Sequence, residues 1–428
     1  MMKRLSIVGL LFVCGLTAAA QQALYNYCPY YQHPDGLACL IGDLSRTGNP
    51  KATGLTAFDT TLAETLGQLP LAVPFSGVEI TLGQAGTYEL TYANLGSVMS
   101  ERADTLGKNH LFVGFTYQRF GFQTIDGTKL RSLPTEGAVS SALLYADNHL
   151  TATVDQYMGV AAFGITNRLD LSVTVPVERV GLSGGDSGAF EASPSSCINT
   201  NQCFFSSGSA QFASGAASGV GDVILEVKGQ VWNGERLRVA AGGEVRFPTG
   251  NEFNLLGSGA YGVKPYLTVS RHGRFTPHAN LGFQWNGRSA LYLANIAPPT
   301  APAADWVHLQ LPRSLEYSAG ADFGIVRRIT LVTDLLGQHF FNAPRVTSPQ
   351  QVLDPSYMSG TQPYLLPNGQ PVTSIGIRHA DYDTDNLGLG LKVNPWKNLL
   401  VTGNVLFKLN EGGLRSKAVP LIGLSYRF

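Results

Sequence analysis

The stretch VGDVILEVKGQVWNGERLRVAAGGEVRF, residues 220–247, contains two alternating segments around a short polar turn. In the first segment every second residue is apolar, and most residues between them are charged or carry an amide. A period of two is typical of a β-strand with one apolar and one polar face. The apolar face comprises Val223, Leu225, Val227 and Val231, and the polar face Asp222, Glu226, Lys228 and Gln230, with Ile224 as an apolar exception.

The second segment repeats this division and predicts a hairpin. Leu237, Val239, Val245 and Phe247 share one face, whereas Arg238, Glu244 and Arg246 share the other. If the turn at 233–235 pairs Trp232 with Arg236, Gln230 faces Arg238 and Asp222 faces Arg246, a favourable cross-strand pair. A slip of two residues would preserve both faces, so the register stays a hypothesis. A hydrophobic exterior with charges inside is the inverse of a soluble barrel.

The same inversion recurs along the chain and predicts about twelve strands, each long enough to cross a bilayer when tilted. The expected strands are 109–125, 150–166, 169–181, 219–232, 236–247, 260–270, 274–287, 312–326, 328–341, 383–394, 398–408 and 416–428. Outward aromatic residues near strand ends are typical of interfacial girdles: Phe247, Tyr261, Trp285, Phe341 and Tyr426.

The connections between these strands alternate in length. Short connections lie at 167–168, 233–235, 271–273, 327–328 and 394–398. The others are mostly long, at 126–149, 182–218, 248–259, 288–311 and 342–382, with a tight exception near 410–413. This asymmetry is typical of outer-membrane barrels, whose short turns face the periplasm. A soluble sandwich would not need it. The fold class is therefore all-β, a transmembrane antiparallel β-barrel of about 12 strands.

Composition supports a barrel over a helical membrane protein. The chain is 44% hydrophobic and only 14% charged, and after the leader it has no run of 18 apolar residues. Spanning helices are thereby excluded. Alternating lipid-facing and lumen-facing residues average out in any window, which accounts for the neutral mean hydropathy.

The two ends of the chain predict its destination. Residues 1–20 resemble a secretory signal peptide, with Lys3 and Arg4, an apolar stretch and Ala18-Ala19-Ala20 before Gln21. A lipoprotein site at Cys14 is disfavoured by bulky Val13. The last strand presents Ile422, Leu424, Tyr426 and Phe428 on one face, which resembles the signal by which outer-membrane barrels are recognised for assembly. We expect the outer membrane of a Gram-negative-type bacterium, with its lipid and the barrel-assembly machinery as partners.

Charge and cysteines narrow the function further. Loss of Lys3 and Arg4 with the leader leaves 28 bases against 30 acids, so nothing suggests nucleic-acid binding. Four mature cysteines, Cys28, Cys39, Cys197 and Cys203, predict two local disulfides, Cys28–Cys39 and Cys197–Cys203, out of three connectivities. No set of four ligands at zinc-like spacing surrounds either pair, and we expect no metal or cofactor.

Residues 21–108 differ from the rest and predict an N-terminal periplasmic or plug segment before the barrel at 109–428. They contain a Pro/Gly-rich stretch, a helical candidate at 58–67 and two short strand-like runs, 77–82 and 88–93. These runs are too short to cross a membrane comfortably. If they extend the wall, the barrel has fourteen strands.

Alternation places both signs of charge inside the barrel. The expected inward acids are Asp155, Asp170, Glu178, Asp222, Glu226, Glu244, Glu316, Asp322 and Asp334, and the bases Lys228, Arg238, Arg246, Lys264, Lys392, Lys408 and Arg427. Ten candidate lumen-lining residues follow: Asp222, Glu226, Lys228, Arg238, Glu244, Arg246, Asn280, Asp322, Lys392 and Lys408. Balanced charge suits a narrow lumen filled or gated by side chains better than a pore selecting one ion sign.

Three short motifs stand out: Val220-Gly221-Asp222-Val223, Phe247-Pro248-Thr249-Gly250 and the strand–turn–strand run 163–171. They resemble an outer-membrane family, the one named for the meta-pathway of phenol degradation. The resemblance covers roughly residues 109–428 and implies a transporter barrel distantly similar to fatty acid and aromatic hydrocarbon channels.

We therefore predict a monomeric, non-enzymatic channel for passive uptake or export of small molecules, hydrophobic or aromatic compounds among them. One alternative is a structural or surface-interaction barrel with a closed lumen. The second is an outer-membrane lipid hydrolase, for which the strand-associated candidates are His110, His149, His278 and His339. None of these has a serine partner evident in the sequence, and His339 is expected to face lipid.

Overall fold

The computed structural model describes residues 65, 69, 80–82, 88–90, 95–139, 142–192, 197–199, 202–203, 206–207, 212–289, 309–326, 328–351, 370–396 and 398–428. The predicted leader, the Cys28–Cys39 pair and all but Thr65 of the helical candidate lie outside these residues. Within them, no helix is both long and apolar enough to cross a bilayer.

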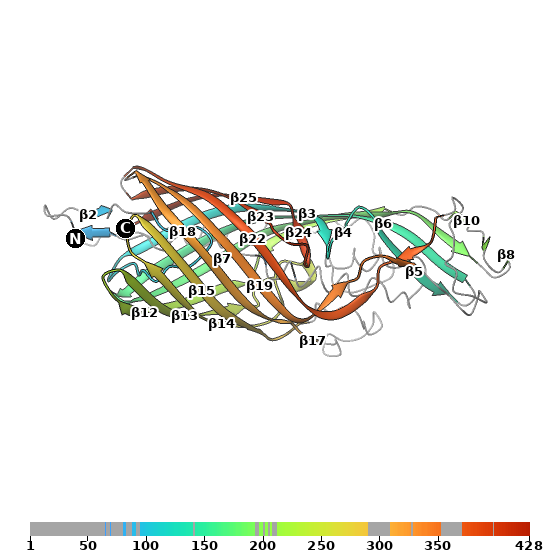
Figure 1. Cartoon of the computed structure of the whole chain (residues 1–428), viewed down its shortest axis with the longest axis horizontal. Coiled ribbons are helices and arrows are strands. Elements are labelled where there is room, and N and C mark those ends of the chain that lie inside the picture. Colours follow the sequence, from blue (N-terminus) through green and yellow to red (C-terminus); the bar gives the residue numbers. More distant parts are fainter. Residues whose placement is uncertain are drawn as a thin grey trace.

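In this part of the chain, twelve long antiparallel strands close into a barrel, which confirms the predicted fold class (Figure 1). The wall strands are β3 (Leu111–Ile125), β6 (Ala142–Thr166), β7 (Leu169–Ala192), β12 (Val223–Asn233), β13 (Leu237–Phe247), β14 (Gly262–Arg271), β15 (Phe275–Asn286), β18 (Arg313–Val326), β19 (Ile329–Val346), β22 (Ile377–Trp396), β23 (Leu399–Lys408) and β25 (Ala418–Arg427). Full closure leaves no strand edge in the wall, as a bilayer requires.

The last strand closes the barrel on the first. Leu424 of β25 pairs with Phe115 of β3, and Tyr426 pairs with Val113. At the end of the ladder, the backbone N–H of Phe428 donates to the carbonyl of Leu111 at 2.7 Å. The alternation predicted for residues 422–428 is therefore that of a closing strand; its role as an assembly signal stays a prediction.

Short strands continue or decorate the wall. β11 (Phe212–Val220) extends β12 along β7, and β24 (Leu414–Ser416) extends β25 along β3; β4 (Thr128–Lys129), β5 (Leu133–Val139) and β10 (Ser206–Ser207) also join the barrel sheet. Separate pairs are β8 (Cys197–Asn199) with β9 (Gln202–Cys203), β16 (Arg288–Ser289) with β17 (Leu309–Gln310), and β20 (Gln350–Gln351) with β21 (Thr373–Ser374). A 3-10 turn, η2, spans Glu252–Asn254.

The fourteen-strand alternative is wrong. β1 (Ile80–Leu82) and β2 (Tyr88–Leu90) correspond to the two short runs, but they pair only with each other and do not join the wall. Three residues per strand is too short to span a bilayer, so the barrel keeps twelve strands.

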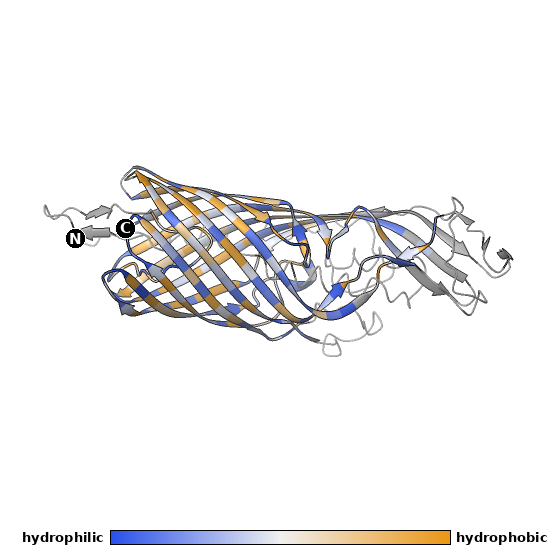
Figure 2. Cartoon of the chain, viewed as in Figure 1, coloured by the Kyte–Doolittle hydropathy of each residue, from blue (hydrophilic) through white to orange (hydrophobic). Residues whose placement is uncertain are grey.

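Hydrophobic and hydrophilic residues alternate along the wall strands (Figure 2), and the hydrophobic residues exposed on the outer surface include aromatic residues at both ends of the barrel. Exposed aliphatic residues include Val227, Leu267, Leu281, Leu389 and Ile422. At the long-loop end Tyr261, Trp285 and Phe341 are exposed, and at the short-turn end Trp232, Trp396, Tyr426 and Phe428. An apolar band between two aromatic girdles is the exterior of a membrane-spanning barrel, which confirms the predicted outer-membrane location.

The predicted hairpin register is wrong by two residues. Arg246 pairs with Ile224 rather than Asp222, and Gln230 pairs with Ala240 rather than Arg238. Two features accommodate the difference. The register shifts between Gln230 and Trp232, and the turn is wider than predicted, closed by a hydrogen bond from the Gly234 N–H to the Leu237 carbonyl. Both faces are preserved because the slip is even. Asp222 still reaches Arg246 diagonally, with Oδ2 3.7 Å from Nε.

One expected inward acid faces outward. Asp155 on β6 accepts a hydrogen bond from the Tyr117 hydroxyl at 2.7 Å on the outer surface, whereas its neighbours Val154 and Gln156 are buried inside. The strands β6 and β7 have 25 and 24 residues, longer than a bilayer needs, and much of the predicted loops 126–149 and 182–218 is strand. Beyond the apolar band the two faces exchange character, so parity alone misassigned Asp155.

The second predicted cysteine pair is brought together along the backbone. Cys197 and Cys203 are cross-strand partners in the β8–β9 pair. A disulfide between them stays a prediction, as does the Cys28–Cys39 bridge.

Candidate functional site

The interior of the barrel contains a cavity of about 310 Å³ toward its long-loop half. One wall is polar and charged: Glu178, Asp222, Glu226, Glu244, Arg246, Lys264, Gln284 and Glu316. A second part of the lining is apolar and aromatic: Phe120, Phe122, Leu256, Leu336, Phe340, Tyr382, Leu406, Leu414 and Val419. A volume of this size holds a small molecule, and the two walls would orient one that is partly apolar.

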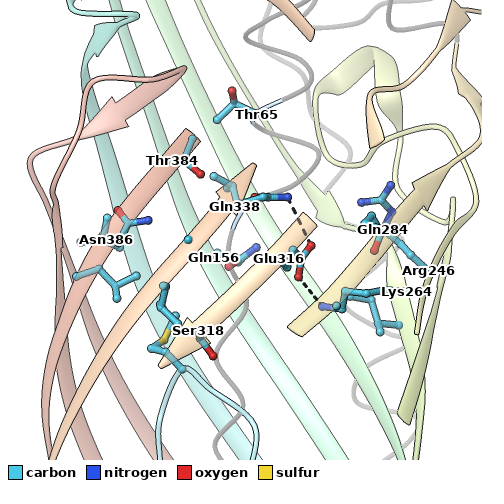
Figure 3. Close-up of a pocket in the computed structure, with 18 of the residues that line it drawn as sticks. Thr65, Gln156, Arg246, Lys264, Gln284, Glu316, Ser318, Gln338, Thr384 and Asn386 are labelled. Atoms are coloured by element: carbon cyan, nitrogen blue, oxygen red, sulfur yellow. Dashed lines mark hydrogen bonds and ion pairs between the residues drawn. The ribbon is translucent and has the colours of Figure 1, made fainter. Parts of the chain in front are cut away.

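Lys264 organises the polar wall (Figure 3). Its Nζ lies 2.9 Å from Glu244 Oε1 and 2.9 Å from Glu316 Oε2. Glu316 also receives a hydrogen bond from Gln338 on the next strand. The positions follow from the ladder, because Glu244 is the cross-strand partner of Lys264. This cation is therefore already shared between two carboxylates.

Glu226 is held by two hydroxyls rather than by a cation of the wall. Ser172 Oγ donates to Glu226 Oε2 at 2.9 Å, and the Tyr266 hydroxyl donates to Oε1. The Tyr266 ring crosses Gly242, its cross-strand partner, where a Cβ would collide with the ring atoms. A glycine at this position is what allows the tyrosine to lie flat along the wall.

Two of the motifs that resemble a known family meet at the cavity edge. Thr249 Oγ1 donates to the Gly221 carbonyl at 2.7 Å and accepts from the Val223 N–H at 2.9 Å. Asp222 then accepts from the backbone N–H of Gly250 at 3.1 Å and of Ser258 at 2.8 Å. The Gly-Asp and Pro-Thr-Gly residues thus fold the 248–259 connection inward as part of the cavity wall.

The floor of the cavity is a chain segment inside the lumen, residues 95–106, here called the luminal segment. Met99, Ser100 and Glu101 line the cavity. Side chains from β7, β12, β13, β14, β15, β18, β19, β22 and β25 make polar contacts with the segment. Residues of the other three wall strands, β3, β6 and β23, form an apolar cluster with Leu95 and Leu106. The segment therefore contacts the full circumference of the barrel.

Ion pairs and backbone acceptors anchor the luminal segment. Lys228 Nζ lies 2.7 Å from Glu101 Oε2, and both side chains are buried. Lys392 donates from the opposite wall to the carbonyls of Leu95 and Ser97. These two lysines are among the largest fully buried side chains, which is costly unless each is fully paired.

Asp104 forms the centre of a second ionic anchor. Arg102 Nη2 lies 2.6 Å from its Oδ2, and Arg238 pairs with Oδ1. Burial by itself would raise the pKa of the Asp104 carboxyl, but the two guanidinium groups outweigh it and hold the pKa below its ordinary value. Arg102 also reaches Asp322 at 3.6 Å, which connects the segment to β18.

A buried serine–histidine–aspartate cluster lies where the luminal segment meets β15 and β19. Ser100 Oγ is 2.7 Å from His278 Nε2 and donates to Asp334 Oδ1 at 2.5 Å. Asp334 Oδ1 also lies 2.8 Å from the same histidine nitrogen. The other nitrogen, Nδ1, is 3.8 Å from Asp322 and 3.2 Å from the Thr276 carbonyl. A catalytic triad would need the carboxylate on Nδ1 and a serine free of it, so this geometry anchors the segment instead.

The ten candidate lumen-lining residues fall into three groups. Asp222, Glu226, Glu244, Arg246 and Asn280 line the cavity. Lys228, Arg238, Asp322 and Lys392 contact the luminal segment below it. Lys408 belongs to neither group, because it pairs with Glu411 at 2.6 Å at the loop end of β23.

In the described part of the chain, neither His149 nor His339 contacts a buried serine. His339 faces outward, as expected, and its Nδ1 lies 2.8 Å from Asp383 on β22. Among the described residues, no group of three or more His, Cys, Asp or Glu side chains is placed to hold a metal ion.

The sequence did not predict which residues of the N-terminal segment enter the barrel. Glu101, Arg102 and Asp104 carry its ionic contacts and Ser100 adds hydrogen bonds, in a chain with only 14% charged residues. A dense charged run just before the first strand was the available signal. Its meaning depended on knowing that Lys228 on β12, Arg238 on β13 and Asp322 on β18 face it across the lumen.

Comparison with solved structures returns outer-membrane barrels. An outer-membrane channel from Pseudomonas putida F1 is 13% identical with a TM-score of 0.42, covering 76% of this chain and 98% of that chain. The toluene transporter TodX of P. putida is 10% identical with a TM-score of 0.31, covering 76% and 90%. A FadL homologue of Pseudomonas aeruginosa is 10% identical with a TM-score of 0.30, covering 76% and 90%.

No curated protein matches this chain. Residues 136–317 match the family described as "Putative MetA-pathway of phenol degradation", which confirms over this part of the chain the family resemblance predicted from its motifs.

Proposed function

We propose that this protein is a passive outer-membrane channel for small molecules, closed in the described conformation by its luminal segment. The observation that supports this most is the cavity inside the lumen, whose floor is that segment. A purely structural barrel has no need of an interior cavity with one charged and one aromatic wall.

The contacts of the segment are of a kind that can open. Most are ion pairs and hydrogen bonds, such as Glu101–Lys228 and Leu106 N–H to Asp170 Oδ2 at 2.8 Å, which water can replace once the lumen is hydrated. The segment's apolar contacts are a small cluster around Leu95 and Leu106 and the packing of Val98 and Met99 against the larger core cluster. We infer that residues 21–108 act as a plug whose last part is the luminal segment, behind a cleaved leader at 1–20 and ahead of the barrel at 109–428.

The cargo we propose is a small, partly apolar or aromatic molecule. Support comes from the aromatic wall, where the rings of Phe120 and Phe122 stack with centroids 5.9 Å apart, and from the phenol-degradation family match. We propose no enzymatic activity and no cofactor. Delivery by the barrel-assembly machinery and a monomeric state in outer-membrane lipid complete the proposal.

The experiment that tests it is a reversible lock on the luminal segment. The Ala103 N–H donates to Ser270 Oγ at 3.2 Å, so cysteines introduced at 103 and 270 are placed to crosslink the segment to β14. We expect conductance in planar bilayers from the reduced double variant, its loss on oxidation and its return with reductant. Each single-cysteine variant and the wild type, taken through the same redox cycle, are the controls.

Two other results would overturn the proposal. No conductance under either condition, in a protein that reconstitutes as a folded barrel, would favour the closed-lumen alternative. Equal conductance before and after crosslinking would show that solutes do not pass the luminal segment.

The hydrolase alternative has one observation in its favour, the 2.7 Å contact of Ser100 with His278. A hydrolase would release fatty acid from phospholipid vesicles and lose that activity in Ser100→Ala. We expect no release from either protein.

A further inference from the structure

The charges that line the cavity do not balance among the described residues. Six carboxylates line it, from Glu101, Glu178, Asp222, Glu226, Glu244 and Glu316, against three cations, Arg246, Lys264 and Arg415. Lys264 is shared by two of the carboxylates. Arg415 is turned to the Asp385 carbonyl and to Asn386 Oδ1, the latter at 2.9 Å. Since Glu101 is paired with Lys228 outside the lining, five acidic side chains remain against these three cations.

Glu178 is the clearest part of this excess. Its side chain is only 6% exposed, and its one hydrogen bond among the described residues comes from Gln156 Nε2 at 2.7 Å. No cation of the described chain forms an ion pair with it. Removing a carboxylate from water without a counter-charge is costly, so burial favours the protonated carboxyl group. A cationic ligand would supply the missing charge and stabilise the carboxylate.

Asp222 lies next to Glu178 across two glycines. A Cβ built on Gly221 would lie 3.3 Å from the Glu178 Cδ, and one on Gly257 would collide with Asp222 Oδ1. The absence of both side chains leaves the two carboxyl groups at one corner of the cavity. Arg246 approaches Asp222 only to 3.7 Å and gives its own short bond, 2.8 Å, to Asn286.

The same corner adjoins apolar surface. Phe120, Phe122 and Leu256 belong to one buried cluster that reaches the cavity, and Pro176 lines it two residues before Glu178. Ser416, on the neighbouring wall, is 8% exposed and its Oγ has no hydrogen-bond partner among the described residues. An unpartnered buried hydroxyl that lines a cavity is a further ligand contact.

We propose that this cavity binds small organic cations with an apolar body, the ammonium group at Glu178 and Asp222 and the apolar body along Phe120 and Phe122. The inference deepens the proposed channel function, on which its biological meaning rests, by naming the class of cargo. Carboxylates of similar shape should be excluded by the negative wall, and neutral analogues should bind through the apolar wall alone.

Three probes with one aromatic body isolate the charge. We suggest 2-phenylethylamine, 2-phenylethanol and 3-phenylpropionate, titrated calorimetrically into the detergent-solubilised full-length protein at neutral pH. An ammonium–carboxylate hydrogen bond at a buried site corresponds to about tenfold or more in affinity, so the amine should bind at least that much more tightly than the alcohol. The carboxylate should bind most weakly.

Glu178→Gln keeps the size of the side chain and removes the charge. We expect amine affinity to fall about tenfold in this variant while the affinity for the alcohol stays within about twofold. Glu235→Gln, in an exposed turn at the other end of the barrel, is the matched control and should change neither. Heat-modifiable electrophoretic mobility confirms that each variant is a folded barrel.

Equal affinity for the three probes, or an amine affinity unchanged by Glu178→Gln, would overturn the inference. Binding in detergent needs no bilayer, so its failure is distinguishable from failure of the channel. Discrimination among the probes without conductance would leave the site intact and refute transport. Conductance without discrimination among the probes would support transport and refute the cation site.

Discussion

Loss of the Lys228 ammonium tests how strongly the luminal segment is held. Lys228→Met keeps the length of the side chain and removes its charge, which leaves Glu101 buried without the partner now 2.7 Å away. Breaking a buried ion pair from one side costs about 3–5 kcal/mol. Because about 1.4 kcal/mol corresponds to a factor of ten, the ratio of undocked to docked segment should rise by about two to three and a half orders of magnitude.

The assay is single-channel recording, with open probability as the readout of undocking. We expect Lys228→Met to be open far more often than the wild type. Adding Glu101→Gln should restore much of the closure, because the double variant no longer buries the Glu101 carboxylate without its cation. The control is Lys408→Met, whose partner Glu411 is 52% exposed, so that this pair contributes at most about 1 kcal/mol. An open probability equal to that of the wild type in Lys228→Met, or no rescue in the double variant, would refute the ionic-anchor reasoning.

Three further predictions concern the same anchors and walls. The pKa of Asp104 is held below its ordinary 3.8, so its contribution to docking is complete above that pH and is lost as the pH falls through the lowered pKa. The open probability should therefore be flat from pH 8 to 5 and rise only below about 4. Asp104→Asn should abolish this pH dependence. Gly242→Ala should push the Tyr266 ring away from Glu226 and lower the free energy of unfolding by about 1–3 kcal/mol. Gly243→Ala should be neutral, because a Cβ there meets nothing within 4 Å. Thermal denaturation in detergent compares the two variants. Cysteines at 224 and 246 should form a disulfide more readily than cysteines at 222 and 246, and the opposite order would restore the register predicted from sequence.

Much of the fold was predictable because membrane barrels impose local rules. Lipid requires an apolar residue at every second position, and the short turns leave little freedom in connecting neighbouring strands. All twelve predicted strands are therefore present in the described residues, most with ends within a few residues of expectation. Where strands such as β6 and β7 leave the apolar band, this constraint disappears, and the prediction for Asp155 failed there.

The candidate site was less predictable, since inward residues can be assigned from parity but their partners cannot. Lys228 and Lys392 were expected as lumen-lining residues that face their neighbours in the wall. The structure pairs them instead with a segment more than 120 residues earlier in the chain. No short-range pattern encodes such contacts.

The sequence by itself determined the class of solvent on each side of the wall: alternating residues specify lipid outside and polar groups inside, because side chains on a strand point to opposite faces with a period of two. Tertiary structure alone decided what fills the interior. Whether an inward lysine faces water, a cross-strand acid or a buried segment depends on which distant residues closure brings across the lumen. Here closure encircles residues 95–106, leaving a cavity with one charged and one aromatic wall above them.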